Sequence, residues 1–457
     1  MVRCCERHPQ HHTNSVHAAG VYYSLLPTLM AASPDILARV QRREQRNAVL
    51  AGFLGWTFDA FDFFVLTFLI GDIGKAFGKS RPEVALTLTL TLAMRPVGAL
   101  FFGVMADRYG RRLPMAINIV FYAVVSALSG LAPTFQIFLI LRMLFGIGMG
   151  GQWGVSASLA LESISPKWRG LISGMLHQGY SLGNLLAATA FLVVYPAIQR
   201  TLPAYAWRVM FFLGGLPALL SFFVLTRVKE SEAWHEHRTD WRSYVKSLPP
   251  TWRRFLYLVL LLTAMGFISH GTQDLYPTFL LQQRKFSQQH TAIITIISMV
   301  GATLGGMLIG YCSDRFGRRR AMIGAVLGAL AMIPLWIGAP GTALLVASAF
   351  LMQFFVQGAW GVIPAHMNEL TPAHLRGFVP GFAYQIGMLI AGVVPYLEAL
   401  VGEHFSYALA MGGFAGAAFL AVALITGFGP EAHGIAFRKG GEPFSRTAGK
   451  ADAALRA

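Results

Sequence analysis

A group of polar side chains interrupts the apolar run at residues 254–281. It contains His270 and Asp274, which are four residues apart and therefore share one face of a helix. An imidazole beside a carboxylate can take up and release a proton near neutral pH. Ser269 and Gln273 share an adjacent face. A single histidine in an apolar helix can be a packing residue, but the whole constellation favours a site that handles protons.

Three further charged residues lie inside apolar runs, where a charge is costly and marks a functional site by default. Asp59 and Asp62 are three residues apart and share a helix face. Two such carboxylates disfavour joint ionisation, so one of them is expected to hold a proton; alternatively, both fix packing by hydrogen bonds. Arg95 suits a carboxylate because its guanidinium is a planar fork. It either contacts an anionic substrate or pairs with Asp59 or Asp62, and a substrate could break such a pair.

A stretch of ten residues, 103–112, returns as residues 310–319, an offset of 207. The same offset aligns Trp153 with Trp360 and Gln178 with Gln385, so the chain is two copies of one unit. In the repeated stretch, glycines permit a tight turn and close helix approach, and the aspartate can accept hydrogen bonds or pair with an arginine. These properties indicate packing and anchoring roles for Gly103, Asp107, Arg108, Gly110, Arg111, Asp314, Arg315, Gly317 and Arg318. Glu162 and Glu369 lie beside these loops and are expected to form ion pairs with arginines there; Arg169 and Arg376 belong to the same structural set.

Polar and aromatic residues in the repeated helices supply further candidates. Gln178 and Gln385 could donate to a carboxylate or hydroxyl from both halves, or they could bond helix to helix. Gln152, Trp153 and Trp360 are candidates for lining a cavity. Arg142 has no charged counterpart, because the offset leads to Ala349; near the start of its run, it could extend to the membrane interface.

The elements that position these residues are apolar runs long enough to cross a bilayer as helices. The chain has 457 residues, of which 55% are hydrophobic and only 13% charged, with a mean hydropathy of +0.53. Twelve runs recur, at 48–72, 84–106, 113–132, 135–161, 171–196, 207–227, 254–281, 288–312, 319–338, 341–365, 377–401 and 406–428. The predicted fold class is an all-α membrane protein with two pseudo-symmetric six-helix bundles. The predicted parts are a tail at 1–46, bundles at 47–227 and 254–428, a linker at 228–253 and a tail at 429–457.

The net charge of +16 does not indicate nucleic acid, because the basic residues lie in short loops between apolar runs. That distribution is typical of the cytoplasmic side, so both termini are expected inside the cell. The three cysteines support no disulfide framework. The chain contains neither a phosphate-binding G-x-x-x-x-G-K-[ST] loop nor an H-E-x-x-H zinc motif. An enzyme is therefore disfavoured, and no cofactor or metal is expected; an ion or solute gradient would drive the protein.

The stretch G-x-x-x-D-R-x-G-R-R, repeated after the second and eighth runs, resembles the loop signature of the major facilitator superfamily. This resemblance covers about residues 45–430. It implies two bundles around a central site that rock to give alternating access. It also implies that Asp107, Arg108, Asp314 and Arg315 act in gating and packing rather than in substrate binding. The superfamily carries an arginine similar to Arg142, for which the resemblance implies a part in proton transfer.

The pattern in the seventh run resembles the monocarboxylate permeases of the sialate:proton symporter family. Their signature N-x-x-[ST]-H-x-[ST]-Q-D-x-x-x-T is matched by Ser269, His270, Thr272, Gln273, Asp274 and Thr278, while Gly266 replaces the leading Asn. The resemblance implies proton coupling by His270 and Asp274 and carboxylate recognition by Arg95. The departure at Gly266 puts the role of the Asn, and with it the substrate range, in doubt.

The expected function is proton-coupled symport of a small monocarboxylate such as lactate or pyruvate, with an organic anion and a proton as partners in a lipid bilayer. Alternatives are sialic acid, another organic or aromatic acid, or a neutral sugar, which would have little need of Arg95. A sensor without flux is a third class. We expect a functional monomer in a bacterial inner membrane. Residues 1–29 are expected to be a mis-assigned extension, since Met30 is a natural start, and 429–457 a loose tail.

Overall fold

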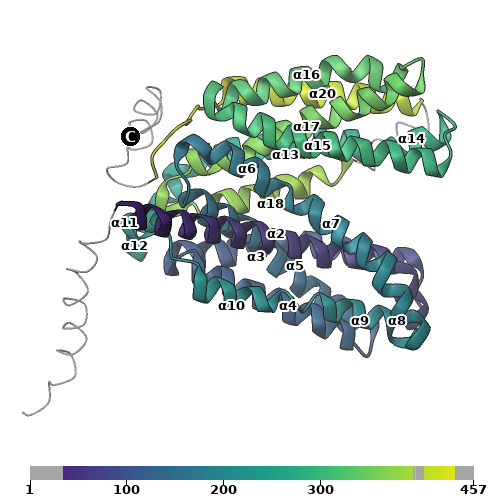
Figure 1. Ribbon diagram of the computed structural model, residues 1–457, viewed down its shortest axis with the longest axis horizontal. Helices are drawn as coiled ribbons and strands as arrows, with labels where there is room; N and C mark the ends of the chain where they lie inside the picture. The colour runs from purple at the N-terminus through teal and green to yellow at the C-terminus, as the bar shows by residue number, and fades with distance from the viewer. Residues whose placement is uncertain (1–33, 395–396, 398–405, 438–457) are drawn as a thin grey trace, which may run out of the picture. The chain divides into compact units, whose positions relative to one another are not determined.

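A computed structural model describes residues 34–394, 397 and 406–437; the expectations for residues 1–29 and 438–457 lie outside these residues. The chain divides into two compact units, Met1–Arg46 and Asn47–Ala457. Residues 34–46 of the first unit are helical. All further description concerns the second unit, in which the described residues form helices and turns without a strand (Figure 1). The all-helical prediction is confirmed.

The helices follow the predicted runs, with several runs divided. The first repeat contains α2 (Pro34–Phe77), α3 (Arg81–Tyr109), α4 (Arg112–Leu131), α5 (Phe135–Glu162), α6 (Arg169–His177), α7 (Gly179–Thr189), α8 (Tyr195–Thr201), α9 (Ala206–Leu213) and α10 (Ala218–Arg227). The linker holds α11 (Glu232–Glu236) and α12 (Trp241–Ser247). The second repeat contains α13 (Trp252–Gln273), α14 (Tyr276–Gln282), α15 (Gln288–Phe316), α16 (Arg318–Gly338), α17 (Thr342–Leu370), α18 (Val379–Ala391) and α20 (Tyr407–Phe428).

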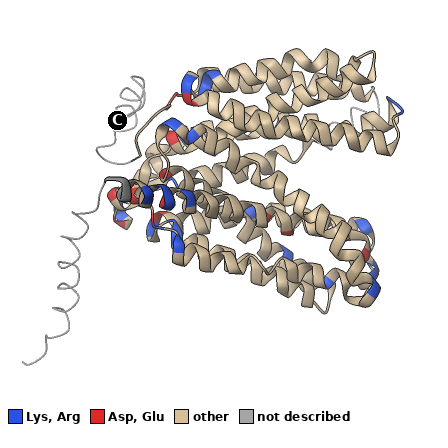
Figure 2. Ribbon diagram, viewed as in Figure 1, with Lys and Arg blue, Asp and Glu red and all other residues tan. Residues whose placement is uncertain are grey.

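Eleven helical segments of the described chain are long and apolar enough to cross a membrane. The twelfth predicted run, 377–401, is represented by the shorter apolar helix Val379–Ala391, and part of its remainder lies outside the described residues. Figure 2 shows that Lys, Arg, Asp and Glu gather at helix ends, while the helix bodies are nearly free of them. This pattern is expected when a helix body faces hydrocarbon and only its ends reach water.

The same helix crossing occurs in both repeats and holds the candidate site in place. In the first repeat, a Cβ added to Gly98 of α3 would lie 1.7 Å from the carbonyl oxygen of Ile147 on α5. The equivalent Gly305 of α15 would lie 1.8 Å from the carbonyl oxygen of Phe354 on α17. Only glycine permits two backbones to approach so closely. This crossing brings Arg95 of α3 against α5.

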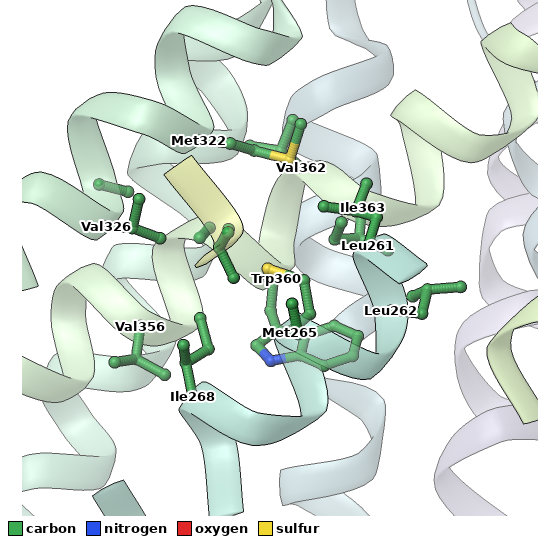
Figure 3. Packing of buried hydrophobic residues seen from close by; sticks show 14 of the residues in the cluster. Leu261, Leu262, Met265, Ile268, Met322, Val326, Val356, Trp360, Val362 and Ile363 are labelled. Atoms are coloured by element: carbon green, nitrogen blue, oxygen red, sulfur yellow. The ribbon is translucent and has the colours of Figure 1, made fainter. Parts of the chain in front are cut away.

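The two repeats meet through α6, which packs against α15 and α17, and through α18, which packs against α3 and α5 (Figure 1). Glycines again allow contact, since Gly174 lies against the backbone of Gly306 and Gly154 against that of Gly381. Within the second repeat, the hydrophobic core joins α13, α16 and α17; Figure 3 shows Met265 and Ile268 beside Trp360 and Val356. The polar residues of α13 are thus carried by a rigidly packed helix.

Candidate functional site

The repeated loops form one ion-pair network in each repeat. We call the region around the α3–α4 and α15–α16 turns the basic end. Here Arg111 Nη1 donates to Asp107 Oδ1 at 2.6 Å, and Arg318 Nη1 donates to Asp314 Oδ1 at 2.9 Å. Gly110 and Gly317 turn the chain with φ of +101° and +94°, which favours glycine. The predicted turn residues therefore do take a turn conformation.

Each of these aspartates also reaches across to the other repeat. Asp107 accepts hydrogen bonds from the backbone N–H groups of Gly377 and Phe378, at 2.6 and 3.0 Å. Asp314 accepts from those of Gly170 and Leu171, at 2.8 and 3.2 Å. Gly103 belongs to the same contact, because a Cβ there would lie 2.7 Å from the Phe378 Cα. The aspartates thus bind each repeat to the backbone at the start of the other repeat's interface helix.

The glutamates pair with arginines, as the sequence predicts, but not symmetrically. Arg111 Nη2 is 3.1 Å from Glu162, and Arg318 Nε is 2.8 Å from Glu369. Arg169 adds a second arginine to Glu369 at 2.9 Å, whereas Arg376 Nε donates to the Asn368 carbonyl oxygen. Glu162 instead accepts a short hydrogen bond from Ser231 of the linker.

Burial and pairing act in opposite directions on the arginines of this network. Burial alone would lower the pKa of Arg111, but Glu162 and Asp107 outweigh it and hold that pKa above its usual value. Burial lowers the pKa of Arg376 to about 9. Arg108 and Arg315 lie apart from the network: Arg108 reaches the carbonyl of Thr239 at 3.4 Å and the exposed Arg315 reaches its neighbour Tyr311 at 2.6 Å. The carboxylates of this network pair with Arg111, Arg169 and Arg318.

A buried ion pair occupies the interior of the first repeat. Arg142 is 1% exposed, and its Nη2 lies 3.4 Å from Asp62 Oδ2. Ser126 donates a short hydrogen bond to the other carboxylate oxygen. The guanidinium also lies over the Phe145 ring, 4.2 Å from its centroid. The expectation that Arg142 extends to the membrane interface is therefore wrong, because its side chain turns inward to a partner that spacing along the chain does not reveal.

Arg95 has no carboxylate partner among the described residues. It is 6% exposed, and its Nε and Nη2 atoms have no hydrogen-bond partner there. Asp59 is fully buried, and neither of its carboxylate oxygens has a hydrogen-bond partner in the part of the chain that the structure describes. The predicted alternative, an ion pair of Arg95 with Asp59 or Asp62, does not form in this conformation. Asp62 pairs with Arg142, and Asp59 interacts electrostatically with Arg95 but forms no hydrogen bond with it. The Arg95 guanidinium instead lies 5.8 Å from the ring centroid of Tyr384.

Two aromatic stacks join the repeats, and the 207-residue offset relates them. Trp153 of α5 stacks on Tyr384 of α18 at 4.4 Å, and Trp360 of α17 stacks on His177 of α6 at 5.2 Å. His177 and Tyr384 are equivalent positions, so each repeat's tryptophan meets the other repeat's partner. His177 and Tyr384 are not among the residues predicted from the sequence, although the offset aligns them. The predicted lining residues Trp153 and Trp360 thus lie where the repeats meet.

The predicted glutamines differ in what they bond. Gln152 is satisfied inside the first repeat, by Asn118 and Ser156 at 2.9 Å each. Gln385 donates to the Gly150 carbonyl at 3.2 Å, but its Oε1 has no partner among the described residues. Gln178 Nε2 is likewise buried and without a partner there. His177 contacts Gln357 at 3.0 Å, a residue that sequence analysis missed.

The constellation on α13 forms as the spacing predicts. His270 Nδ1 and Asp274 Oδ2 are 2.9 Å apart, with side chains 27% and 36% exposed. Gln273 donates to Gln353 of α17 at 2.9 Å. In the part of the chain that the structure describes, no group of His, Cys, Asp and Glu could hold a metal ion.

Comparison with known proteins supplies the remaining observations. The model of the Major Facilitator Superfamily matches residues 52–302 and 275–451. A probable 4-methylmuconolactone transporter of Cupriavidus pinatubonensis is 29% identical, with 87% of this chain and 94% of the relative covered. The sialic acid transporter NanX of Escherichia coli is 27% identical, with 80% and 90% covered. A carboxylic acid transporter protein homolog of Saccharomyces cerevisiae is 26% identical over 79% of this chain, which spans only 62% of that relative's length.

Solved structures resemble the fold. The outward conformation of FucP has a TM-score of 0.65 at 13% identity, with 83% of this chain and 99% of that one covered. The proton:xylose symporter XylE has a TM-score of 0.64 at 20% identity, with 85% and 96% covered. At these identities the similarity concerns the fold, and it agrees with the predicted pair of six-helix bundles.

Proposed function

Since the chain belongs to the major facilitator superfamily, a family of integral membrane transporters, we propose that it carries a small monocarboxylate together with a proton by alternating access. The observation that carries this proposal is Arg95, a buried guanidinium with two nitrogen atoms that have no partner among the described residues. Leaving charged donors unpaired in a dry site is costly, and a carboxylate that binds them bidentately would remove that cost. Relatives named for carboxylic acid, sialic acid and methylmuconolactone support the substrate class.

The proton has two candidate carriers in this proposal. His270 and Asp274 are bonded to each other and partly exposed, so water can deliver a proton to them. Asp59 is buried and receives no hydrogen bond from any described residue, and ionising such a group without a partner is unfavourable. Movement of one proton with one monocarboxylate is electroneutral, so the pH gradient would drive it. No cofactor is needed, and the proposed setting is a monomer in a bacterial inner membrane with its termini in the cytoplasm.

A second candidate is a larger organic acid with further polar groups, such as a sialic acid. Near the repeat interface, three buried polar atoms have no hydrogen-bond partner within the described ranges, namely Gln178 Nε2, Gln385 Oε1 and Trp360 Nε1. A small acid such as lactate has only one hydroxyl group to satisfy them, whereas a polyhydroxylated acid has several. A neutral sugar would satisfy the amides but would leave Arg95 unpaired.

The test is uptake of labelled acids into proteoliposomes with an imposed inward proton gradient. Native protein should take up the acid faster as the gradient increases. Arg95→Gln removes the charge-assisted hydrogen bonds, so kcat/KM should fall roughly 10- to 100-fold. Arg200→Gln is the matched control, because that arginine is exposed in the last turn of α8, and it should leave kcat/KM unchanged. Gradient-independent uptake by the native protein would contradict symport.

Proton coupling on α13 is tested separately with His270→Ala in the same vesicles. Gradient-driven uptake should collapse, while exchange of labelled for unlabelled acid without a gradient should persist. If gradient-driven uptake persists in His270→Ala and is lost in Asp59→Asn, the proton is carried by the first repeat instead. Competition by sialic acid but not by lactate or pyruvate would select the second candidate.

A further inference from the structure

The segment that follows α20, residues 429–437, folds over the basic end. Glu431 accepts a hydrogen bond from the backbone N–H of Arg319 at 3.0 Å, and His433 Nε2 donates to the Asp314 carbonyl oxygen at 2.9 Å. The chain turns at Gly434, whose φ is +79°. Ala432, His433, Ile435 and Phe437 are all buried. These residues, expected to be part of a loose tail, are therefore anchored on the α15–α16 turn of the second repeat.

The end of this segment contacts both repeats at once. The Phe437 ring centroid lies 3.6 Å from the guanidinium carbon of Arg169 and 3.6 Å from that of Arg376. Arg169 begins α6 of the first repeat, and Arg376 precedes α18 of the second. Arg169 Nη1 also donates to the Ile435 carbonyl oxygen at 2.8 Å. One aromatic ring and one carbonyl thus join elements of different repeats.

The Phe437 ring stabilises Arg169 and Arg376 electrostatically. Both are almost fully buried, and like charges held close together in a dry site repel each other. Arg169 Nε and Arg376 Nη1 have no hydrogen-bond partner among the described residues. An aromatic face attracts a guanidinium, most strongly when both are desolvated. Removing the ring would leave two cations without that attraction and would admit water between them.

We propose that residues 429–437 are a latch that keeps the two repeats together at the basic end and that Phe437 is its bridging contact. When the repeats part at this end, Arg169 and Arg376 separate, and the ring can remain against only one of them. The latch therefore favours the conformation described here over one that is open at the basic end. A ligand or change that weakens the latch shifts the population toward the open form.

The experiment is hydrogen–deuterium exchange, read by mass spectrometry on the full chain in detergent, with Phe437→Ala. Its matched control is Phe428→Ala, which removes the same ring from a position that is 89% exposed. We expect the backbone amides of 169–177 and 373–378 to exchange roughly 5- to 30-fold faster in Phe437→Ala. Losing one desolvated cation–π contact changes an opening equilibrium by about this factor. Phe428→Ala should leave them at the native rate.

Two further variants test whether the ring itself is responsible. Phe437→Tyr keeps an aromatic face and should exchange like the native chain, whereas Phe437→Leu keeps apolar bulk and should exchange nearly as fast as Phe437→Ala. Equal rates in the Leu and Tyr variants would overturn the cation–π contact. Native rates in Phe437→Ala, or an increase spread over the whole chain, would overturn the latch. Because the readout needs no substrate, its failure is distinguishable from failure of the proposed transport.

Discussion

Residues related by the 207-residue offset are alike at the basic end but differ in the middle of the helices. At the basic end, Asp107 and Asp314 each pair with the arginine four residues on and each accept two backbone N–H groups from the opposite repeat. In the middle, the charges are not repeated: the counterparts of Arg95, Asp62 and Arg142 are Ala302, Ser269 and Ala349. The turns at the basic end thus make equivalent contacts in both repeats, whereas the buried charges in the middle of the helices belong to the first repeat alone.

The largest predicted effect concerns the unrepeated ion pair. Asp62→Leu leaves Arg142 charged and buried without its carboxylate, which should lower the free energy of unfolding by about 3–5 kcal/mol. The double variant Asp62→Leu with Arg142→Leu removes both charges and should lose less than the single variant. Reversible unfolding in detergent measures both. Equal losses in the two variants would show that the uncompensated arginine is not the cause.

A smaller effect on stability should reveal where the ion-pair network at the basic end departs from symmetry. Glu369 pairs with Arg318 and Arg169, whereas Glu162 pairs with Arg111 and a serine. Glu369→Gln should therefore cost more stability than Glu162→Gln, by about 1.5–3 kcal/mol, the value of a charged hydrogen bond. The same unfolding measurement, made on both variants, tests this difference in stability. Equal costs would mean that Arg169 contributes nothing to the pairing.

The smallest effect should be the same in both repeats. Gly98→Ala and Gly305→Ala each place a methyl group against a carbonyl oxygen of the crossing helix, so each should cost about 1–3 kcal/mol. Gly324→Ala is the matched control, because nothing lies within 4 Å of its added Cβ. It should be neutral or stabilising, since alanine favours a helix over glycine. A large difference between Gly98→Ala and Gly305→Ala in apparent melting temperature would show that the two crossings are not equivalent.

Local spacing predicted those parts of the site that lie within one helix or one turn. His270 and Asp274 are bonded because a four-residue separation places side chains together on any helix. Gly110 and Gly317 turn the chain where the repeated motif predicts a turn. Local spacing could not predict which of Asp59 and Asp62 pairs with an arginine. The two are close in sequence, but Asp62 alone forms an ion pair with Arg142 of α5. Phe437 was also beyond prediction, since its partners lie 61 and 268 positions earlier in the chain.

The amino-acid sequence by itself determined the apolar runs, the duplicated unit and the list of charges that must be buried. These follow from composition and periodicity, which operate along the chain. Only the tertiary structure decided the partner of each charge: Arg142 for Asp62, none for Arg95 among the described residues, and the ring of Phe437 for two arginines. The physical reason is that a partner depends on which helix faces cross and how closely. That closeness is set by glycines whose effect appears only when two helices meet.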